Sequence, residues 1–124
     1  MFVITENKSI CLTRGDVAVI EVNARKNESE LYTFAPGDVV RFKVFAKKQC
    51  DKIALVVDTV VSEETTSVDI LLDSNHTKIG DVINKPVDYW YEIELNPDTH
   101  PQTIIGYDSD GPKIFTLYPE GGDA

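Results

Sequence analysis

Apolar and polar residues alternate along most of this chain, which is the two-residue period of β-strands rather than the 3.6-residue period of amphipathic helices. The clearest run is VDYWYEIEL, residues 87–95, where one face carries only Val, Tyr, Ile and Leu. No long segment carries a helical stripe, and one short helical turn is predicted at 75–79, capped by Ser74 or Asn75. The pattern predicts about eight or nine short strands, drawn from residues 1–5, 9–13, 16–23, 31–34, 38–47, 50–62, 66–73, 87–95, 101–108 and 113–120.

Two of the predicted strands open on the same dipeptide. LTRGDVAVIEV, residues 12–22, and APGDVVRFKV, residues 35–44, both place Gly-Asp before hydrophobic residues at every second position. Glycine permits positive φ and aspartate can accept bonds from nearby amides, so each Gly-Asp is expected to turn the chain and open a strand facing one core. Arg14-Gly15-Asp16 also matches an adhesion tripeptide. Because Pro36 stands in the second copy where Arg14 stands in the first, we interpret the arginine as incidental.

Short strands with a turn signal about every ten residues predict an all-β fold. We expect a β-sandwich, Ig-like or jelly-roll-like, with mainly antiparallel strands. The length of 124 residues fits one domain over 1–124, with the polar tail 120–124 disordered.

Charge and hydropathy narrow the range of partners. The net charge of −9, from 21 acidic and 12 basic residues, argues against a nucleic-acid partner, because phosphate contacts need a basic face. No apolar run approaches the ~20 residues of a membrane span. The opening MFVITENKSI lacks the features of a signal peptide, so we expect synthesis in the cytoplasm and no membrane partner.

Candidate metal and cysteine sites are weak. His76 and His100 stand alone, without the spacing of a metal site or a nucleophile elbow. Residues 108–112, DSDGP, begin like a calcium loop but continue into a strand, which favours a turn. Cys11 and Cys50 have no CxxC spacing, and the sequence leaves open whether they are free thiols or a disulfide. We therefore expect no metal and no cofactor.

Catalysis has little support in the sequence. Glu92 and Glu94 could serve as paired acids in a hydrolase. They share an exposed strand face with Asp88, however, where like charges are normally solvated or paired with basic residues on a neighbouring strand. We expect no catalytic residues, and thus a protein that is not an enzyme.

Trp90 is the most informative single residue. It lies on the polar face of the 87–95 strand together with Asp88 and Glu92, and Arg41 and Lys43 on the 38–47 strand are candidate basic partners for those acids. An exposed tryptophan on such a face fits a protein interface or a platform for sugar stacking. The alternative is that Trp90 is packed under a loop. Trp90, Arg41, Lys43, Asp88 and Glu92 are thus the interface candidates.

The ordered set of LTRGDVAVIEV, FAPGDVVRFKV, VDYWYEIEL and TIIGYDSDGPKIFTLYPE resembles small all-β modules of tailed phages and prophages. It is similar to the amino-terminal domain of upper-baseplate (receptor-binding-carrier) proteins of phages of Gram-positive bacteria. One departure is Pro86-Val87-Asp88, where these modules usually carry glycine before the first tyrosine. The residues that fit their strand motifs are Tyr89, Tyr91, Glu92, Ile93, Leu95, Thr103 and Ile104.

The resemblance implies a non-enzymatic structural module of a phage tail or baseplate. Such a module docks onto other tail or baseplate proteins, can form a homo-oligomer such as a trimer, and resides in the virion tail after assembly. The alternative, from another class, is a carbohydrate-binding β-sandwich that uses Trp90 as its stacking platform.

Overall fold

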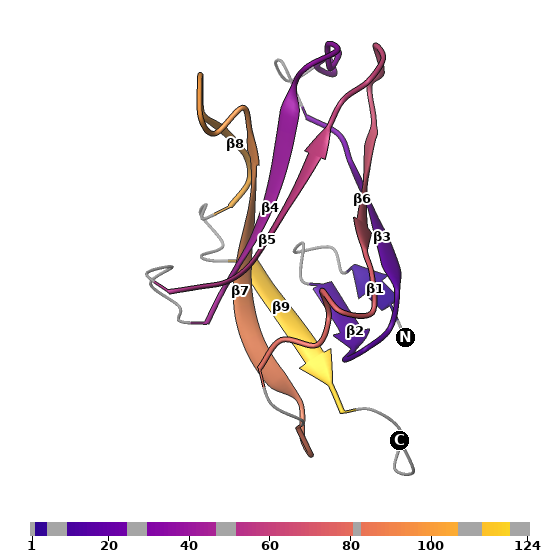
Figure 1. The fold of residues 1–124 in the computed structure, drawn as a ribbon, viewed down its shortest axis with the longest axis vertical. Helices are drawn as coiled ribbons and strands as arrows, with labels where there is room; N and C mark the ends of the chain where they lie inside the picture. Colours follow the sequence, from indigo (N-terminus) through magenta and orange to yellow (C-terminus); the bar gives the residue numbers. More distant parts are fainter. Residues whose placement is uncertain are drawn as a thin grey trace.

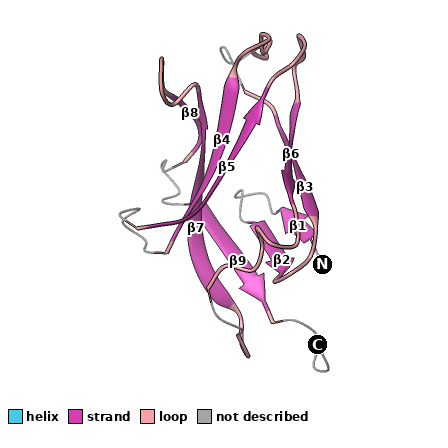
Figure 2. Cartoon of the chain, viewed as in Figure 1, coloured by secondary structure: helices cyan, strands magenta, loops and turns pink. Residues whose placement is uncertain are grey.

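The computed structural model describes residues 2–4, 10–24, 30–46, 52–80, 83–106 and 113–119, and within them the fold is all-β, without a helix (Figures 1 and 2). The all-β prediction is confirmed. The strands are β1 (Phe2–Ile4), β2 (Ile10–Thr13), β3 (Ala18–Val22), β4 (Val39–Phe45), β5 (Ile53–Val60), β6 (Val68–Leu72), β7 (Val87–Leu95), β8 (Gln102–Ile105) and β9 (Lys113–Tyr118).

The strands form two sheets that stack as a β-sandwich. The larger sheet is seven-stranded, with the order β1-β2-β9-β7-β4-β5 and with β8 also paired to β7. The smaller sheet contains β3 and β6, which form the second layer in Figure 1. All pairings are antiparallel except β2 with β9, as the sequence led us to expect for most of them. Since β4 and β8 both pair with the end of β7, they flank it on opposite sides.

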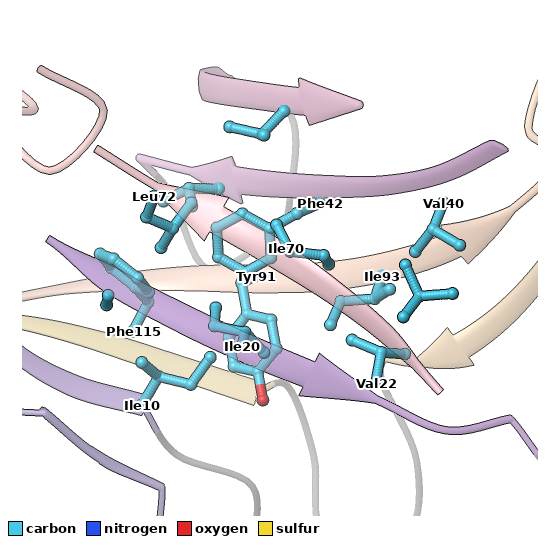
Figure 3. Close-up of a cluster of buried hydrophobic side chains, with 14 of the residues drawn as sticks. Ile10, Ile20, Val22, Val40, Phe42, Ile70, Leu72, Tyr91, Ile93 and Phe115 are labelled. Atoms are coloured by element: carbon cyan, nitrogen blue, oxygen red, sulfur yellow. The ribbon is translucent and has the colours of Figure 1, made fainter. Parts of the chain in front are cut away.

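The core lies between the two sheets. Ile20 and Ile70, which are direct partners on β3 and β6, face the larger sheet and are 2% and 0% exposed (Figure 3). From the larger sheet, the ring of Phe42 lies 5.6 Å from that of Tyr91 and 5.9 Å from that of Phe115. Each of these side chains follows the alternation of its strand. Of the apolar face predicted for 87–95, Tyr91, Ile93 and Leu95 are buried, whereas Val87 and Tyr89 are half-buried.

Both Gly-Asp dipeptides form turns, as predicted. Gly15 and Gly37 have φ values of 90° and 95°, a region that favours glycine. The strands that follow are β3 and β4, whose inward residues belong to one core. They lie in different sheets, so the two similar stretches of sequence contribute to the core from its two layers.

Two local predictions were wrong. Residues 31–34 do not form a strand but only isolated bridges, of which one joins Phe34 to Thr65, because the chain enters the Pro36-Gly37 turn directly afterwards. The turn at residues 74–77 is capped by Asp73 rather than by Ser74 or Asn75, since the Asp73 carboxylate accepts the His76 N–H over 2.9 Å. Cys50, the turn at 108–112 and the tail 120–124 lie outside the described residues.

Candidate docking surfaces

Charged side chains form a network on the outer face of the larger sheet, the face that turns away from β3 and β6. Arg41 on β4 donates to Asp58 of β5 over 2.7 and 3.0 Å and to Asp98, after β7, over 3.0 Å. Lys43, two residues along β4, contacts Glu94 and lies 3.5 Å from Glu92, both on β7. The prediction of basic partners on β4 is confirmed for Lys43.

For Arg41 the predicted partner strand was wrong. Its guanidinium does not bind the acids at the start of β7, because the register places Arg41 opposite Glu94 near the end of that strand and opposite Asp58 on β5. Asp88 lies near the start of β7, where its carboxylate accepts a hydrogen bond from Thr116 Oγ1 of β9 over 2.8 Å.

These contacts shift the pKa values in a consistent way. The hydrogen bond to Arg41 lowers the pKa of Asp58, and the bond to Glu94 raises the pKa of Lys43. Burial raises the pKa of Glu92, and the neighbouring Glu94 carboxylate raises it further, so Lys43 offsets this shift only in part. Arg41 and Lys43 are thus shared among four carboxylates, and the network keeps a surplus of negative charge.

Trp90 is half-buried on the outer face. It pairs directly with Phe45 of β4 on one side and with Ile114 of β9 on the other. Phe45 is only 4% exposed although it lies on this outer face, and Lys43 Nζ lies 6.0 Å from its ring centroid. Trp90 thus belongs to an apolar cross-strand row whose surface is partly covered.

Of the Arg14-Gly15-Asp16 turn, the arginine is held inside the fold, whereas Asp16 is exposed. Arg14 is 7% exposed and donates to the carbonyl of Gly80 over 2.8 Å. The hydroxyl of Thr77 accepts the Gly15 N–H and donates to the Asp16 carbonyl, each over 2.9 Å. A buried arginine cannot be presented to a receptor, which agrees with the interpretation of Arg-Gly-Asp as incidental.

Exposed apolar side chains gather in two places. Among the described residues seven large ones are exposed, and all but Leu31 belong to one of two groups. The first, which we name the β3–β6 patch, is on the outer face of the smaller sheet, where Val19 and Leu71 are direct partners and Val17 lies two residues before Val19. The second, the β5 edge, consists of Ile53, Val56 and Val60.

A groove of about 350 Å³ lies where β5 passes into β6. It is lined mostly by polar and acidic side chains, among them Thr65, Glu63 and Asp69. The described residues contain no group of three or more His, Cys, Asp or Glu that could hold a metal ion. In the same part of the chain no helix has the length and apolar character of a membrane span.

Comparisons of the chain with protein-family models, with curated proteins and with solved structures found no match.

The sequence predictions missed both apolar groups, although the signal was present. DVAVIEV and IALVV carry apolar residues on both faces of the strand rather than in strict alternation. Such two-sided strands are normally covered on both sides. The side chains that the sandwich leaves uncovered are therefore the better interface candidates.

Proposed function

We propose that this chain is a non-enzymatic structural module that assembles with neighbouring protein subunits. The supporting observation is that the exposed large apolar side chains gather on the β3–β6 patch and the β5 edge instead of being scattered. Grouped apolar exposure marks surfaces that other molecules cover, whereas single exposed apolar residues are common on any protein.

The assembly that we propose is a phage or prophage tail or baseplate. This part of the proposal rests on the resemblance of the Gly-Asp strands and of VDYWYEIEL to upper-baseplate modules. The partners would be other tail or baseplate proteins and further copies of this chain. The chain would be synthesised in the cytoplasm and reside in the virion tail once assembled.

Mass spectrometry of phage-like particles, purified from the source cells after DNA-damage induction, tests this proposal. We expect the polypeptide at a few copies per particle, in multiples of three. A matched pair of variants probes the contact: Leu71→Asp on the β3–β6 patch should be lost from particles, whereas Asn84→Asp adds the same charge at another exposed site and should be retained. Absence of the wild-type chain from intact particles would contradict the proposal.

The carbohydrate-binding alternative depends on Trp90, which keeps part of its surface on the outer face beside the carboxylates of β7. Trp90 is the single tryptophan, so its fluorescence reports on a bound sugar directly. Quenching by cell-wall polysaccharide that disappears in a folded Trp90→Ala variant would favour this function. Under the structural function, Trp90→Ala should instead weaken docking onto neighbouring subunits. The polysaccharide should then not quench the fluorescence of the wild type.

A further inference from the structure

We propose that β5 pairs antiparallel with β5 of a second copy, so that the two larger sheets join into one. This inference rests on the proposed function and specifies one of its subunit contacts. β5 ends the order of the seven-stranded sheet and, within the described residues, pairs only with β4, beside which it runs in Figure 1. An edge strand presents backbone donors and acceptors that can form a ladder with another chain.

The hydrogen bonds at the end of β5 show which of its residues supply that edge. Val61, directly after β5, donates its N–H to Asp38 O and accepts the Gly37 N–H, each over 2.8 Å. Backbone groups alternate between the two sides of an antiparallel strand. The odd-numbered residues of 55–61 therefore face β4, and the even-numbered residues point their N–H and C=O groups to the edge: Val56, Asp58 and Val60.

The neighbouring strand gives the same assignment independently. Val39 of β4 donates its N–H to Asn96 Oδ1 over 2.9 Å and accepts the Asn96 N–H over 2.7 Å, so its backbone faces the end of β7. The next residue, Val40, then faces β5, where its register partner is Thr59. Thr59 and its odd-numbered neighbours are thus the residues bonded to β4.

The side chains of β5 leave this edge without the usual protection. Edge strands are commonly blocked by Lys or Pro, and Ile53–Val60 contains neither. Val56 and Val60 are 44% and 64% exposed. The one charged residue of the strand is Asp58, which shares Arg41 of its own chain with Asp98. A second copy therefore brings one partly compensated carboxylate into the contact, and the register has to keep the two Asp58 side chains apart.

A register centred on Val57 fits these constraints. The pairing of β5 with β4 is irregular near Ile53, so the regular edge begins at about Leu55. Centring the two-fold axis on Val57 places Val56 opposite Asp58 of the second copy, twice, and each of these pairs exchanges two backbone hydrogen bonds. Centring it on Asp58 would place two carboxylates directly opposite each other, which is unfavourable.

The dimer is expected to be weak and dependent on salt. One added strand pair and a few valine side chains make a small interface, of the size seen in transient contacts. Each copy also carries a net charge of −9, which repels the other copy at low ionic strength. Added salt screens that repulsion, so the dimer should become tighter as the salt concentration rises.

Two variants of Val56 test the register. In the monomer Val56 lies opposite Lys43 of β4, so Val56→Glu should stabilise the fold relative to Val56→Lys. In the dimer residue 56 lies opposite Asp58 of the second copy, so there lysine is favoured over glutamate. Sedimentation velocity up to about 1 mM protein should show a dissociation constant raised on the order of tenfold by Val56→Glu, since the repulsive pair occurs twice. Val56→Lys should not raise it.

Amide hydrogen exchange provides a second measurement. The N–H groups of Val56 and Asp58 should become protected as protein concentration rises, whereas that of Val57, bonded to β4, should stay protected throughout. A wild type that remains monomeric to about 1 mM, or equal dissociation constants for the two Val56 variants, would overturn the proposal. A monomeric wild type that is nevertheless found in phage particles would refute the β5 dimer alone and leave the proposed function standing.

Discussion

The side chains of Asn96 and Asp38 join the end of β7 to the turn that opens β4. Asn96 Nδ2 donates to Asp38 Oδ1 over 3.2 Å. The other carboxylate oxygen of Asp38 accepts the Tyr32 hydroxyl over 2.8 Å and the Ala35 N–H over 3.0 Å. Burial alone would raise the pKa of Asp38, but the three donors outweigh it and lower the pKa below its ordinary value. The ionised carboxylate is thus the form that the fold stabilises.

We expect Asp38→Asn to lower the free energy of unfolding at pH 7 by about 1–3 kcal/mol, because the amide cannot accept bonds at both of its polar atoms. The stability from a carboxylate with a lowered pKa is present above its unfolded pKa of about 4 and is lost as pH falls through the folded pKa. The difference between wild type and variant should therefore shrink between pH 5 and about pH 2. Urea unfolding across that range measures it, and a constant difference would contradict the role of the charge.

Glu92 should behave in the opposite way. Burial and the adjacent Glu94 raise its pKa, so it favours the fold below its unfolded pKa of about 4.3 and loses that contribution as pH rises through the folded value. Glu92→Gln should thus raise the free energy of unfolding at pH 7 by less than about 1 kcal/mol and have little effect at pH 3. Glu94→Gln is the matched control: it removes the contact that Lys43 makes with Glu94 and should not stabilise the protein.

The strands could be predicted from the sequence because their signal is local. Val87–Leu95 was predicted with its observed bounds, since a strict alternation of nine residues fixes both the strand and its buried face. Gly15 and Gly37 marked turns because few other residues adopt a positive φ. The buried face of β4 was predictable because apolar residues also alternate along that strand.

Contacts between distant segments could not be predicted, because they depend on strand order. The sequence gives no signal that Arg41 would bind Asp58 and Asp98, which flank β4 only through the order β7-β4-β5. The contact of Thr77 with the Gly15 turn depends in the same way on where the segment after β6 returns. Which apolar side chains stay exposed also depends on sheet order, since the same valines would be buried in a central strand.

Thr77→Val should destabilise the fold. The Thr77 side chain is 0% exposed, and its hydroxyl bonds both the Gly15 N–H and the Asp16 carbonyl. Valine keeps the shape but leaves these backbone groups without the hydroxyl, which should lower the free energy of unfolding by about 1–3 kcal/mol. Thr77→Ser retains the hydroxyl and should recover most of the loss in urea unfolding. A Thr77→Val variant as stable as the wild type would contradict the role of the hydroxyl.

Gly37 provides a test of backbone conformation without a steric contribution. Its φ is 95°, and a Cβ added there would meet no heavy atom within 4 Å. Gly37→Ala should therefore lower the free energy of unfolding by about 1–2 kcal/mol through the dihedral angle alone. Gly37→Asn should lower it less, because asparagine tolerates positive φ.

At Gly106 the expected cause of destabilisation is steric, because an added Cβ would lie 2.7 Å from Thr103 Cγ2. Thr103→Ser removes that methyl group and should therefore reduce the loss of stability caused by Gly106→Ala. Thr103→Ser should not change the loss caused by Gly37→Ala, since the effects of distant sites are additive. Thermal unfolding of the single and double variants distinguishes the two causes, and an equal cost for alanine and asparagine at Gly37 would contradict the conformational one.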